Sequence, residues 1–391
     1  MIGCCCLKAP RNHDVPCINA ETISFESIMK ITKVEPFHVC WNHGKSAWVR
    51  LTTEDGSTGW GEISPMWGGG ASLELVKAFA PRLVGQNALD SRVLQDRLFY
   101  DCIKTGPDGA LAAALAGVDV ALWDLKGQIL HQPIYRLLGG AWRTELPFYA
   151  SVGSNAERTV PEVVRAVASW LPLQPALVKI RFDGDKTRRD TDLAGDIQKA
   201  RAVRELVGPD FPLAFDANNT YSVAGALRVG RALEELDYRW FEEPVAHLHT
   251  RSFEQLASKL DIPLAAGEQE YTLRGIQTLI DAGVAILQPD IAKTGGFTGL
   301  SDMAALAKGA GVDFVPHQTQ PMLGHTANLH FVASLLHSHF PCEWNDFSGQ
   351  QNIVVNRPVA PQNGVFRLSV APGLGLDWTM DELEPRLELW K

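Results

Sequence analysis

Two patterns of hydrophobic and polar positions divide the chain. Between residues 29 and 62, apolar and polar positions alternate in ITKVEPFHV, SAWVRLTTEDG and TGWGEIS, with Glu-Asp-Gly as a turn, which predicts an antiparallel meander. Apolar residues then recur at helical spacing in LELVKAFAPRLVG, ALDSRVLQDRLFYDCI and the Ala/Leu-rich DGALAAALAGVDVALWDLKGQIL. Strands followed by helices predict an α+β domain over residues 29–144.

From about residue 145, short apolar runs alternate with amphipathic segments, the pattern of parallel β/α units. Eight strands are predicted, at ELPFYAS, LVKIRF, PLAFDA, YRWFEEP, PLAAGE, VAILQPD, VDFVPH and CEWND. Eight strands within about 200 residues predict a barrel over residues 145–365. The tail, residues 366–391, is expected to return to the first domain. The expected class is α/β, a modified (β/α)8 TIM barrel with an α+β N-terminal capping domain that the C-terminal tail completes.

Six ionisable residues end strand-like runs in the second half of the chain. They are Asp216, Glu242, Glu268, Asp290, His317 and Glu343, separated by 26, 26, 22, 27 and 26 residues. Because all strands of a parallel barrel end at the same rim, these side chains are expected to surround one pocket. A doubly wound open sheet is the rival fold, but the glycine-rich nucleotide turn that usually follows its first strand is absent.

Asp216, Glu242 and Glu268 end the third, fourth and fifth predicted strands. Three carboxylates close together repel one another unless a cation neutralises them, and a set of oxygen ligands suits Mg²⁺. We therefore predict one Mg²⁺ ion per subunit. Alternatively, each carboxylate is a strand-end cap or an ion-pair partner.

Two further pairs are expected at the same rim. Lys179 and Arg181 lie two positions apart on the second strand, so both point to one side; they either face the pocket or are solvent-facing charges. Asp290 and His317 end neighbouring strands, and a carboxylate that orients a histidine makes a general base, although a lone strand histidine can also be a core residue. Glu343 would face the same cavity as a hydrogen-bond donor.

Composition limits the class of protein. A formal net charge of -9 and a pI near 5.7 argue against a nucleic-acid partner. No apolar run approaches the about 18 residues of a membrane span, and no secretory signal is recognisable, so we expect a cytoplasmic protein without a membrane partner. Residues 1–28 are expected to form a disordered leader, although the run Cys4–Cys6 could also serve lipidation or metal binding.

The motifs GWGEIS, GVDVALWDLKGQ, FDANN, WFEEP, GEQE, QPDIAKTGG, VPHQ and CEWND resemble the mandelate racemase subgroup of the enolase superfamily. The resemblance covers about residues 29–385. It implies that Asp216, Glu242 and Glu268 bind Mg²⁺, that Asp290 and His317 form the His–Asp dyad, and that Glu343 contacts the substrate carboxylate. It also implies supporting roles near the site for Asn218 and Lys293.

The chain departs from the racemase pattern at the second strand, where Lys179-Ile180-Arg181 replaces Lys-x-Lys. Arginine keeps its proton, so Arg181 is a poor base. Racemisation needs a base on each face of the carbon, whereas β-elimination needs only one. The replacement favours a dehydratase that converts a sugar acid, an aldonate or aldarate, into a 2-keto-3-deoxy acid. The alternatives are an epimerase, racemase or lactone cycloisomerase, and a non-catalytic sugar-acid-binding protein.

The resemblance places substrate specificity in the cap loops. Candidates for contact with the distal end of the substrate are Trp41, His43, Trp67 and Gly68–Gly70, which could equally serve turns and cap packing. His325 and Asn328 could reach the pocket from the segment after the seventh strand, or cap a helix. The resemblance also implies a homo-oligomer, a dimer or an octamer.

Overall fold

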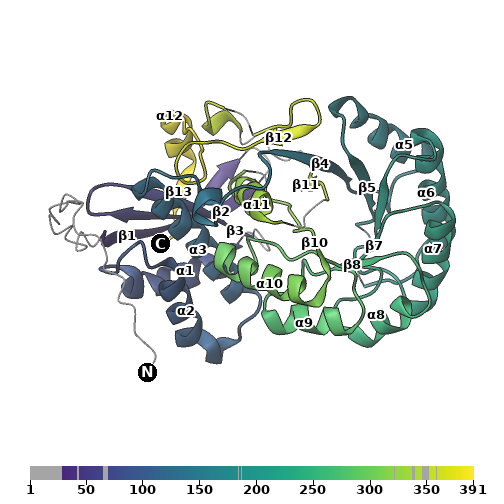
Figure 1. The fold of residues 1–391 in the computed structure, drawn as a ribbon, viewed down its shortest axis with the longest axis horizontal. Coiled ribbons are helices and arrows are strands. Elements are labelled where there is room, and N and C mark those ends of the chain that lie inside the picture. Colours follow the sequence, from purple (N-terminus) through teal and green to yellow (C-terminus); the bar gives the residue numbers. More distant parts are fainter. Residues whose placement is uncertain are drawn as a thin grey trace, which may run out of the picture.

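The computed structural model describes residues 29–41, 44–64, 69–183, 185, 187–320, 322–336, 340–345, 352–357 and 359–391. The expected leader and the candidate residues His43, Trp67 and Gly68 lie outside the described residues. Two domains lie side by side, a small cap that contains the N-terminal strands and a larger barrel (Figure 1). No helix in the described part of the chain is long and apolar enough to cross a membrane.

The cap is a four-stranded antiparallel sheet covered by helices. Its strands are β1 (Ile31–Trp41), β2 (Gly44–Thr53), β3 (Thr58–Ile63) and β13 (Leu387–Leu389), in the order β13-β1-β2-β3. The helices are α1 (Gly70–Leu83), α2 (Ser91–Cys102) and α3 (Ala110–Ile129). Because β13 pairs with β1, the C-terminus of the chain completes the cap sheet.

Small residues allow β3 and α3 to pack closely. Most of α3 is buried, and its Ala-rich face lies directly against β3. A Cβ atom on Gly59 would lie 2.5 Å from the backbone nitrogen of Leu125 and 2.6 Å from its Cβ. A Cβ atom on Gly61 would meet the carbonyl oxygen of Gly117. The glycines of the GWGEIS segment are therefore needed for the close approach of the strand to the helix.

Eight parallel strands form the barrel, as the sequence predicts. They are β4 (Glu145–Val152), β5 (Leu177–Arg181), β6 (Leu213–Asp216), β7 (Phe241–Glu242), β8 (Leu264–Ala266), β9 (Ile286–Leu287), β10 (Asp313–Phe314) and β11 (Cys342–Trp344). The hydrogen-bonded order is β10-β9-β8-β7-β6-β5-β4-β11, so β10 and β11 end the ladder of the described residues. The fold class predicted from the sequence is confirmed.

Helices cover the outside of the barrel (Figure 1). They are α5 (Val160–Ala168), α6 (Leu193–Val207), α7 (Val223–Glu235), α8 (Thr250–Ala257), α9 (Leu273–Asp281), α10 (Gly296–Ala310) and α11 (Leu323–Ser334). The short helices α4 (Ile134–Leu137) and α12 (Met380–Leu383) lie outside this series. Strand β12 (Val365–Arg367) pairs antiparallel with the start of β4, an additional strand that the sequence did not predict.

Buried polar contacts join the cap to the barrel. Asp119 of α3 accepts hydrogen bonds from the backbone nitrogen and the hydroxyl of Thr298 in the first turn of α10, at 3.0 and 2.6 Å. Burial raises the pKa of Asp119 to about 7, against the lowering effect of these bonds. Asp124, also in α3, accepts the backbone N–H groups of Trp60 and Leu374, both at 2.8 Å. The bonds of Asp119 hold the cap against α10 of the barrel, whereas those of Asp124 join α3 to β3 within the cap and to the C-terminal segment.

Candidate active site

An apolar layer inside the barrel lies beneath the site. Seven buried residues form it, one in or beside each of seven strands: Tyr149, Leu177, Ala214, Trp240, Ala265, Ile286 and Val315. Side chains two positions apart on a strand point to the same side. The residues two positions further along each strand therefore also point into the barrel and form the next layer toward the carboxyl ends of the strands. That layer holds Ser151, Lys179, Asp216, Glu242, Gly267, Gln288 and His317. Strand periodicity therefore brings four of the predicted site residues onto one level, namely Lys179, Asp216, Glu242 and His317.

Lys179 lies among three carboxylates. Its Nζ atom is 2.5 Å from Glu242 Oε1, 2.9 Å from Glu343 Oε1 and 3.8 Å from Asp216 Oδ2, and its side chain is 1% exposed. Burial acts to lower the pKa of Lys179, but Glu242 and Glu343 outweigh it and raise the pKa well above its usual value. Lys179 therefore faces the pocket as predicted, as a buried cation.

Tight turns after β6 and β7 orient the carboxylates. Asp216 accepts the backbone N–H of Asn218 at 2.8 Å, and Asn218 has φ 50°, in the left-handed region that asparagine tolerates. Glu243 has φ 39° directly after Glu242 and accepts a hydrogen bond from Asn219 at 2.5 Å. The Asn219–Glu243 hydrogen bond therefore joins the turns of the FDANN and WFEEP segments. Together these turns hold Asp216 and Glu242 at the rim.

His317 forms the predicted pair with Asp290. Its Nδ1 atom is 2.8 Å from Asp290 Oδ2, and its Nε2 atom is 3.0 Å from Glu268 Oε2. Burial acts to lower the pKa of His317, but Glu268, Glu343 and Asp290 outweigh it and raise the pKa to about 10. Asp290 therefore fixes the orientation of the ring and directs Nε2 into the pocket.

Glu343 faces the same cavity from β11. Its Oε2 atom accepts the backbone N–H of Gln318 at 3.0 Å, and its side chain is fully buried. Burial acts to raise its pKa, but Lys179 and His317 outweigh it and lower the pKa to about 2. In this arrangement Glu343 is a carboxylate that accepts hydrogen bonds, whereas the sequence interpretation made it a donor.

Asp183 holds the Arg181 side chain in place. Its Nε atom donates to Asp183 Oδ1 at 2.7 Å, and Asp183 also accepts bonds from the backbone of Ser154 at 2.8 Å and from Asn218 Nδ2 at 3.3 Å. A Cβ atom on Gly153 would lie 3.1 Å from Arg181 Cζ, so the glycine leaves room for the guanidinium in its present position. Burial acts to lower the pKa of Arg181, but Asp183 and Asp216 outweigh it and raise the pKa. Arg181 is a fixed cation.

The cap reaches the site through Glu62 of β3. Its Oε2 atom accepts the backbone N–H of Gly324, in the first turn of α11, at 3.0 Å. The Glu62 side chain is buried, and burial raises its pKa to about 7 against the lowering effect of that bond. Since α11 begins six residues after His317, this contact fixes the segment that follows the base.

The three predicted metal ligands offer the oxygen donors that Mg²⁺ prefers. Asp216 Oδ2 is buried and accepts no hydrogen bond from any of the described residues, which leaves a carboxylate oxygen available for a cation. Among the described residues, no three acidic, histidine or cysteine side chains are arranged to hold one metal ion together. The contacts of Lys179 with Glu242 and of His317 with Glu268 explain this, because each places a basic group on a ligand oxygen. The three carboxylates would fit the ion if the cation displaced Lys179 from Glu242 and His317 from Glu268.

The remaining candidates lie in different places. Lys293 is beside the dyad, with Nζ 3.0 Å from the carbonyl oxygen of Glu268. Trp41 packs within the cap, where its indole N–H donates to Ser46 at 2.9 Å. His325 is buried against Phe366, with a distance of 4.6 Å between ring centroids, and within the described part of the chain neither ring nitrogen has a hydrogen-bond partner. Asn328, one turn further along α11, is also buried, and its side-chain amide has no hydrogen-bond partner among the residues that the structure describes.

Three contributing residues were missed in the sequence. Gln288 Nε2 and Trp240 Nε1 donate to Glu242 Oε2 at 2.8 and 3.0 Å, and Asp183 clamps Arg181. Both Gln288 and Trp240 lie two positions before a predicted site residue, so the two-residue strand period would have indicated them. Asp183 lies in a loop, and its partners come from two other loops, so no sequence spacing indicates its role.

Comparisons with known proteins identify the family to which the chain belongs. The family model described as enolase C-terminal domain-like matches residues 162–382, and the N-terminal domain model of mandelate racemase / muconate lactonizing enzyme matches residues 24–139. A solved structure of a mandelate racemase/muconate lactonizing protein from Paracoccus denitrificans, complexed with magnesium, is 55% identical. Its TM-score is 0.91, and the match covers 93% of this chain and 99% of that one.

Curated relatives are similar over most of their length. D-Galactarolactone cycloisomerase of Agrobacterium fabrum is 31% identical, over 86% of this chain and 89% of its own. Arabinonate dehydratase of Saccharolobus solfataricus is 31% identical, over 84% of this chain and 86% of its own. The relatives thus include both a dehydratase and a cycloisomerase.

Proposed function

Because the chain belongs to the mandelate racemase and muconate lactonizing enzyme family of the enolase superfamily, we propose that it is a Mg²⁺-dependent sugar-acid dehydratase. The substrate class is an aldonate or aldarate. The reaction removes the proton at C2, expels the 3-hydroxyl as water and gives a 2-keto-3-deoxy acid.

The proposal rests on a difference between two ionisable side chains of the site. One is His317, which Asp290 orients so that Nε2 is directed into the pocket. The other is Arg181, a cation tied to Asp183 that cannot readily take a proton. A site with one base and one fixed cation supports elimination better than proton exchange on both faces of the carbon.

Asp216, Glu242 and Glu268 would hold one Mg²⁺ ion per subunit, which supplies a Lewis acid for the substrate carboxylate. Released from its ion pair with Glu268, which raises its pKa, His317 would be neutral, and its Nε2 atom would accept the C2 proton and return it to the departing hydroxyl. Lys179 and Arg181 offer positive charge where negative charge develops on the substrate. Glu343 accepts a hydrogen bond from the substrate and so orients the substrate in the pocket. Loss of water leaves an enol, which tautomerises to the ketone.

A lactone cycloisomerase is the second candidate. It is favoured by the similarity to D-galactarolactone cycloisomerase and by a solved structure of 3,6-anhydro-D-galactonate cycloisomerase from Zobellia galactanivorans, which is 30% identical with a TM-score of 0.81. Both reactions begin with abstraction of the proton on the carbon beside a carboxylate, and they differ in the group that leaves the substrate afterwards. A non-catalytic sugar-acid-binding protein is disfavoured because the base, its orienting carboxylate and the three metal-ligand candidates are all present.

The proposal is tested by a substrate screen. The protein is incubated with Mg²⁺ and a panel of aldonic and aldaric acids, and the product is trapped with semicarbazide, which reacts with 2-keto acids. We expect one acid, or a few related ones, to give product, and the variant His317→Asn to give none. Absence of 2-keto product across the whole panel would rule out the dehydratase.

A further inference from the structure

Lys179 contacts two of the carboxylates that are predicted to hold the metal ion. It lies on β5, whereas Asp216 ends β6 and Glu242 ends β7. Its Nζ atom is 2.5 Å from Glu242 Oε1 and 3.8 Å from Asp216 Oδ2, and all three side chains are buried. A compact positive charge therefore lies beside two of the three predicted ligands.

A third carboxylate, which is not a predicted metal ligand, helps to hold the ammonium group in this position. Glu343 Oε1 is 2.9 Å from Lys179 Nζ, while Glu343 Oε2 accepts the backbone N–H of Gln318. The Lys179 ammonium also lies 5.4 Å from the centroid of the Tyr149 ring, within the range of a cation–π contact. These contacts give the ammonium group one defined position in the site.

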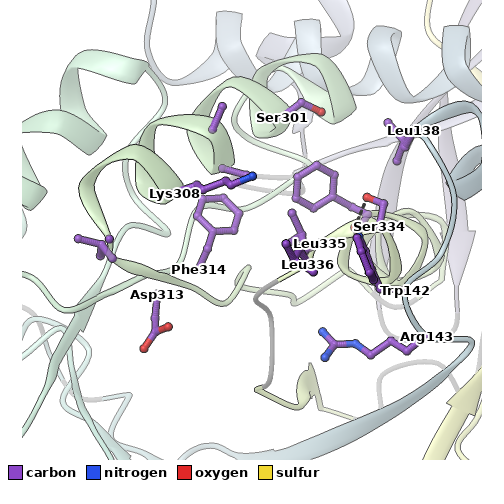
Figure 2. A pocket seen from close by; sticks show the side chains of 15 residues that line it. Leu138, Trp142, Arg143, Ser301, Lys308, Asp313, Phe314, Ser334, Leu335 and Leu336 are labelled. Atoms are coloured by element: carbon purple, nitrogen blue, oxygen red, sulfur yellow. Dashed lines mark hydrogen bonds between the residues drawn. The ribbon is translucent and has the colours of Figure 1, made fainter.

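No other cation of the described residues replaces Lys179. Lys308 and Arg143 line a pocket at the end of the barrel where β4 and β10 begin (Figure 2). The site lies at the other end of the strands. Within the described part of the chain, Lys179 is the only lysine or arginine with a nitrogen within 4.0 Å of a carboxylate oxygen of Asp216 or Glu242. Buried carboxylates that lie close together destabilise a protein unless a cation compensates them, so this contact stabilises the fold.

Glu242 has no oxygen that an ion could take without displacing a donor. Its Oε1 atom contacts Lys179, and its Oε2 atom accepts hydrogen bonds from Trp240 and Gln288 at 3.0 and 2.8 Å. Trp240 belongs to the apolar layer of the barrel, where a movement of the ring requires repacking. Lysine has a flexible four-carbon stem. Lys179 is therefore the donor that can leave Glu242 with the smallest change in the structure.

We propose that Lys179 is an internal counter-cation of the Mg²⁺ site. Lys179 neutralises Asp216 and Glu242 until the ion binds, and it leaves Glu242 Oε1 when the ion takes that oxygen. It therefore stabilises the protein without the ion and weakens the affinity for Mg²⁺. This role is additional to the contact of Lys179 with the substrate, and it rests on the Mg²⁺ site of the proposed function.

The first test is isothermal titration of the EDTA-treated and dialysed full chain with MgCl₂. Lys179→Met should bind Mg²⁺ at least about tenfold more tightly than the unmodified protein, because it lacks both the competing group and a nearby like charge. The matched control is Lys199→Met, which also removes a buried lysine. Lys199 donates to the carbonyl oxygens of Asn155 and Ala156 at 3.0 and 3.2 Å, and its acidic neighbour is Asp196. Its removal should leave the Mg²⁺ affinity unchanged.

Thermal unfolding is the second test. In EDTA, Lys179→Met should unfold at least about 5 °C below the unmodified protein, because buried carboxylates lose their counter-charge. Saturating Mg²⁺ should remove most of that difference, since the ion then supplies the positive charge. Lys199→Met should lower the unfolding temperature by the same amount in EDTA and in Mg²⁺.

Two results would overturn the proposal alone. These are an equal Mg²⁺ affinity of Lys179→Met and the unmodified protein, and a loss of thermal stability in Lys179→Met that is the same in EDTA and in Mg²⁺. Failure of the unmodified protein to bind Mg²⁺ would instead refute the metal site of the proposed function, and this proposal with it.

A measurement on the unmodified protein decides the question if Lys179→Met does not fold. In protein labelled with ¹⁵N-lysine, the Nζ resonance of Lys179 is identified by its absence from Lys179→Arg, which keeps the charge. Saturating Mg²⁺ should shift this resonance, because the ammonium group leaves Glu242. A resonance that Mg²⁺ does not move would overturn the proposal.

Discussion

Gly59→Ala tests whether close contact between β3 and α3 builds the cap. The new Cβ would lie 2.5 Å from the backbone nitrogen of Leu125 and 2.6 Å from its Cβ, whereas ordinary contacts are longer than about 3.4 Å. The helix or the strand must therefore move by roughly 1 Å. Overpacking of this kind costs about 1–3 kcal/mol, which exceeds the about 0.5–1 kcal/mol gained when alanine replaces glycine in a strand.

The assay is urea denaturation followed by circular dichroism. Gly59→Ala should shift the midpoint to lower urea, by an amount that corresponds to about 1–3 kcal/mol. Gly309→Ala is the matched control, because a Cβ on Gly309 meets nothing within 4 Å. That substitution lies within α10 and should stabilise the protein by about 0.5–1 kcal/mol. A Gly59→Ala variant at least as stable as the unmodified protein would refute the packing argument.

Three further predictions concern individual side chains. Asp290→Asn should lower kcat about 10²–10⁴-fold in steady-state assays on the identified substrate, because the His317 ring loses the carboxylate 2.8 Å from Nδ1; an unchanged kcat would exclude a dyad. Arg181→Gln should lower kcat/KM about 10²-fold through loss of the fixed charge, with Arg181→Lys less affected; equal activity of all three would remove Arg181 from the reaction. His330 is buried, and burial lowers its pKa to about 4, whereas a histidine in the unfolded chain has a pKa of about 6.5. As the pH falls below about 6.5, the unfolded state takes up the proton first, so the free energy of unfolding decreases. The difference in unfolding free energy between the unmodified protein and His330→Gln should therefore shrink by about 1 kcal/mol from pH 7.5 to 5.5, and a constant difference would contradict the buried neutral histidine.

The sequence was sufficient for the barrel and for most of the polar layer at its rim. Apolar runs with a period of two residues determine which side chains face inward, and this periodicity is a local property of each strand. The same rule would also have included Gln288 and Trp240, which donate to Glu242. Neither side chain is ionisable at neutral pH, so a pattern of ionisable strand ends does not include them.

Features that depend on several loops could not be predicted. Asp183 reaches Arg181, Ser154 and Asn218 only because three loops converge, and no local pattern encodes that convergence. The position of His325 against Phe366 depends on the packing of α11 beside β12, a strand that was not predicted.

The protonation state of Glu343 also depends on tertiary structure. A carboxyl group in an apolar cavity would be kept neutral by burial, which is why the sequence suggested a hydrogen-bond donor. The structure places Lys179 2.9 Å from Glu343 Oε1 and the backbone N–H of Gln318 at Oε2, and both favour the ionised form. Neither neighbour is close to Glu343 in sequence.

The most direct measurement of the proposed chemistry is the reaction in D₂O with Mg²⁺ and the sugar acid that the screen identifies, followed by NMR. A dehydratase with His317 as its base and Arg181 as a fixed cation should give a 2-keto-3-deoxy acid with solvent deuterium at C3, because the enol takes up a proton there as it tautomerises. Deuterium at C2 of recovered acid with inverted configuration, and no keto acid, would contradict the dehydratase and identify an epimerase.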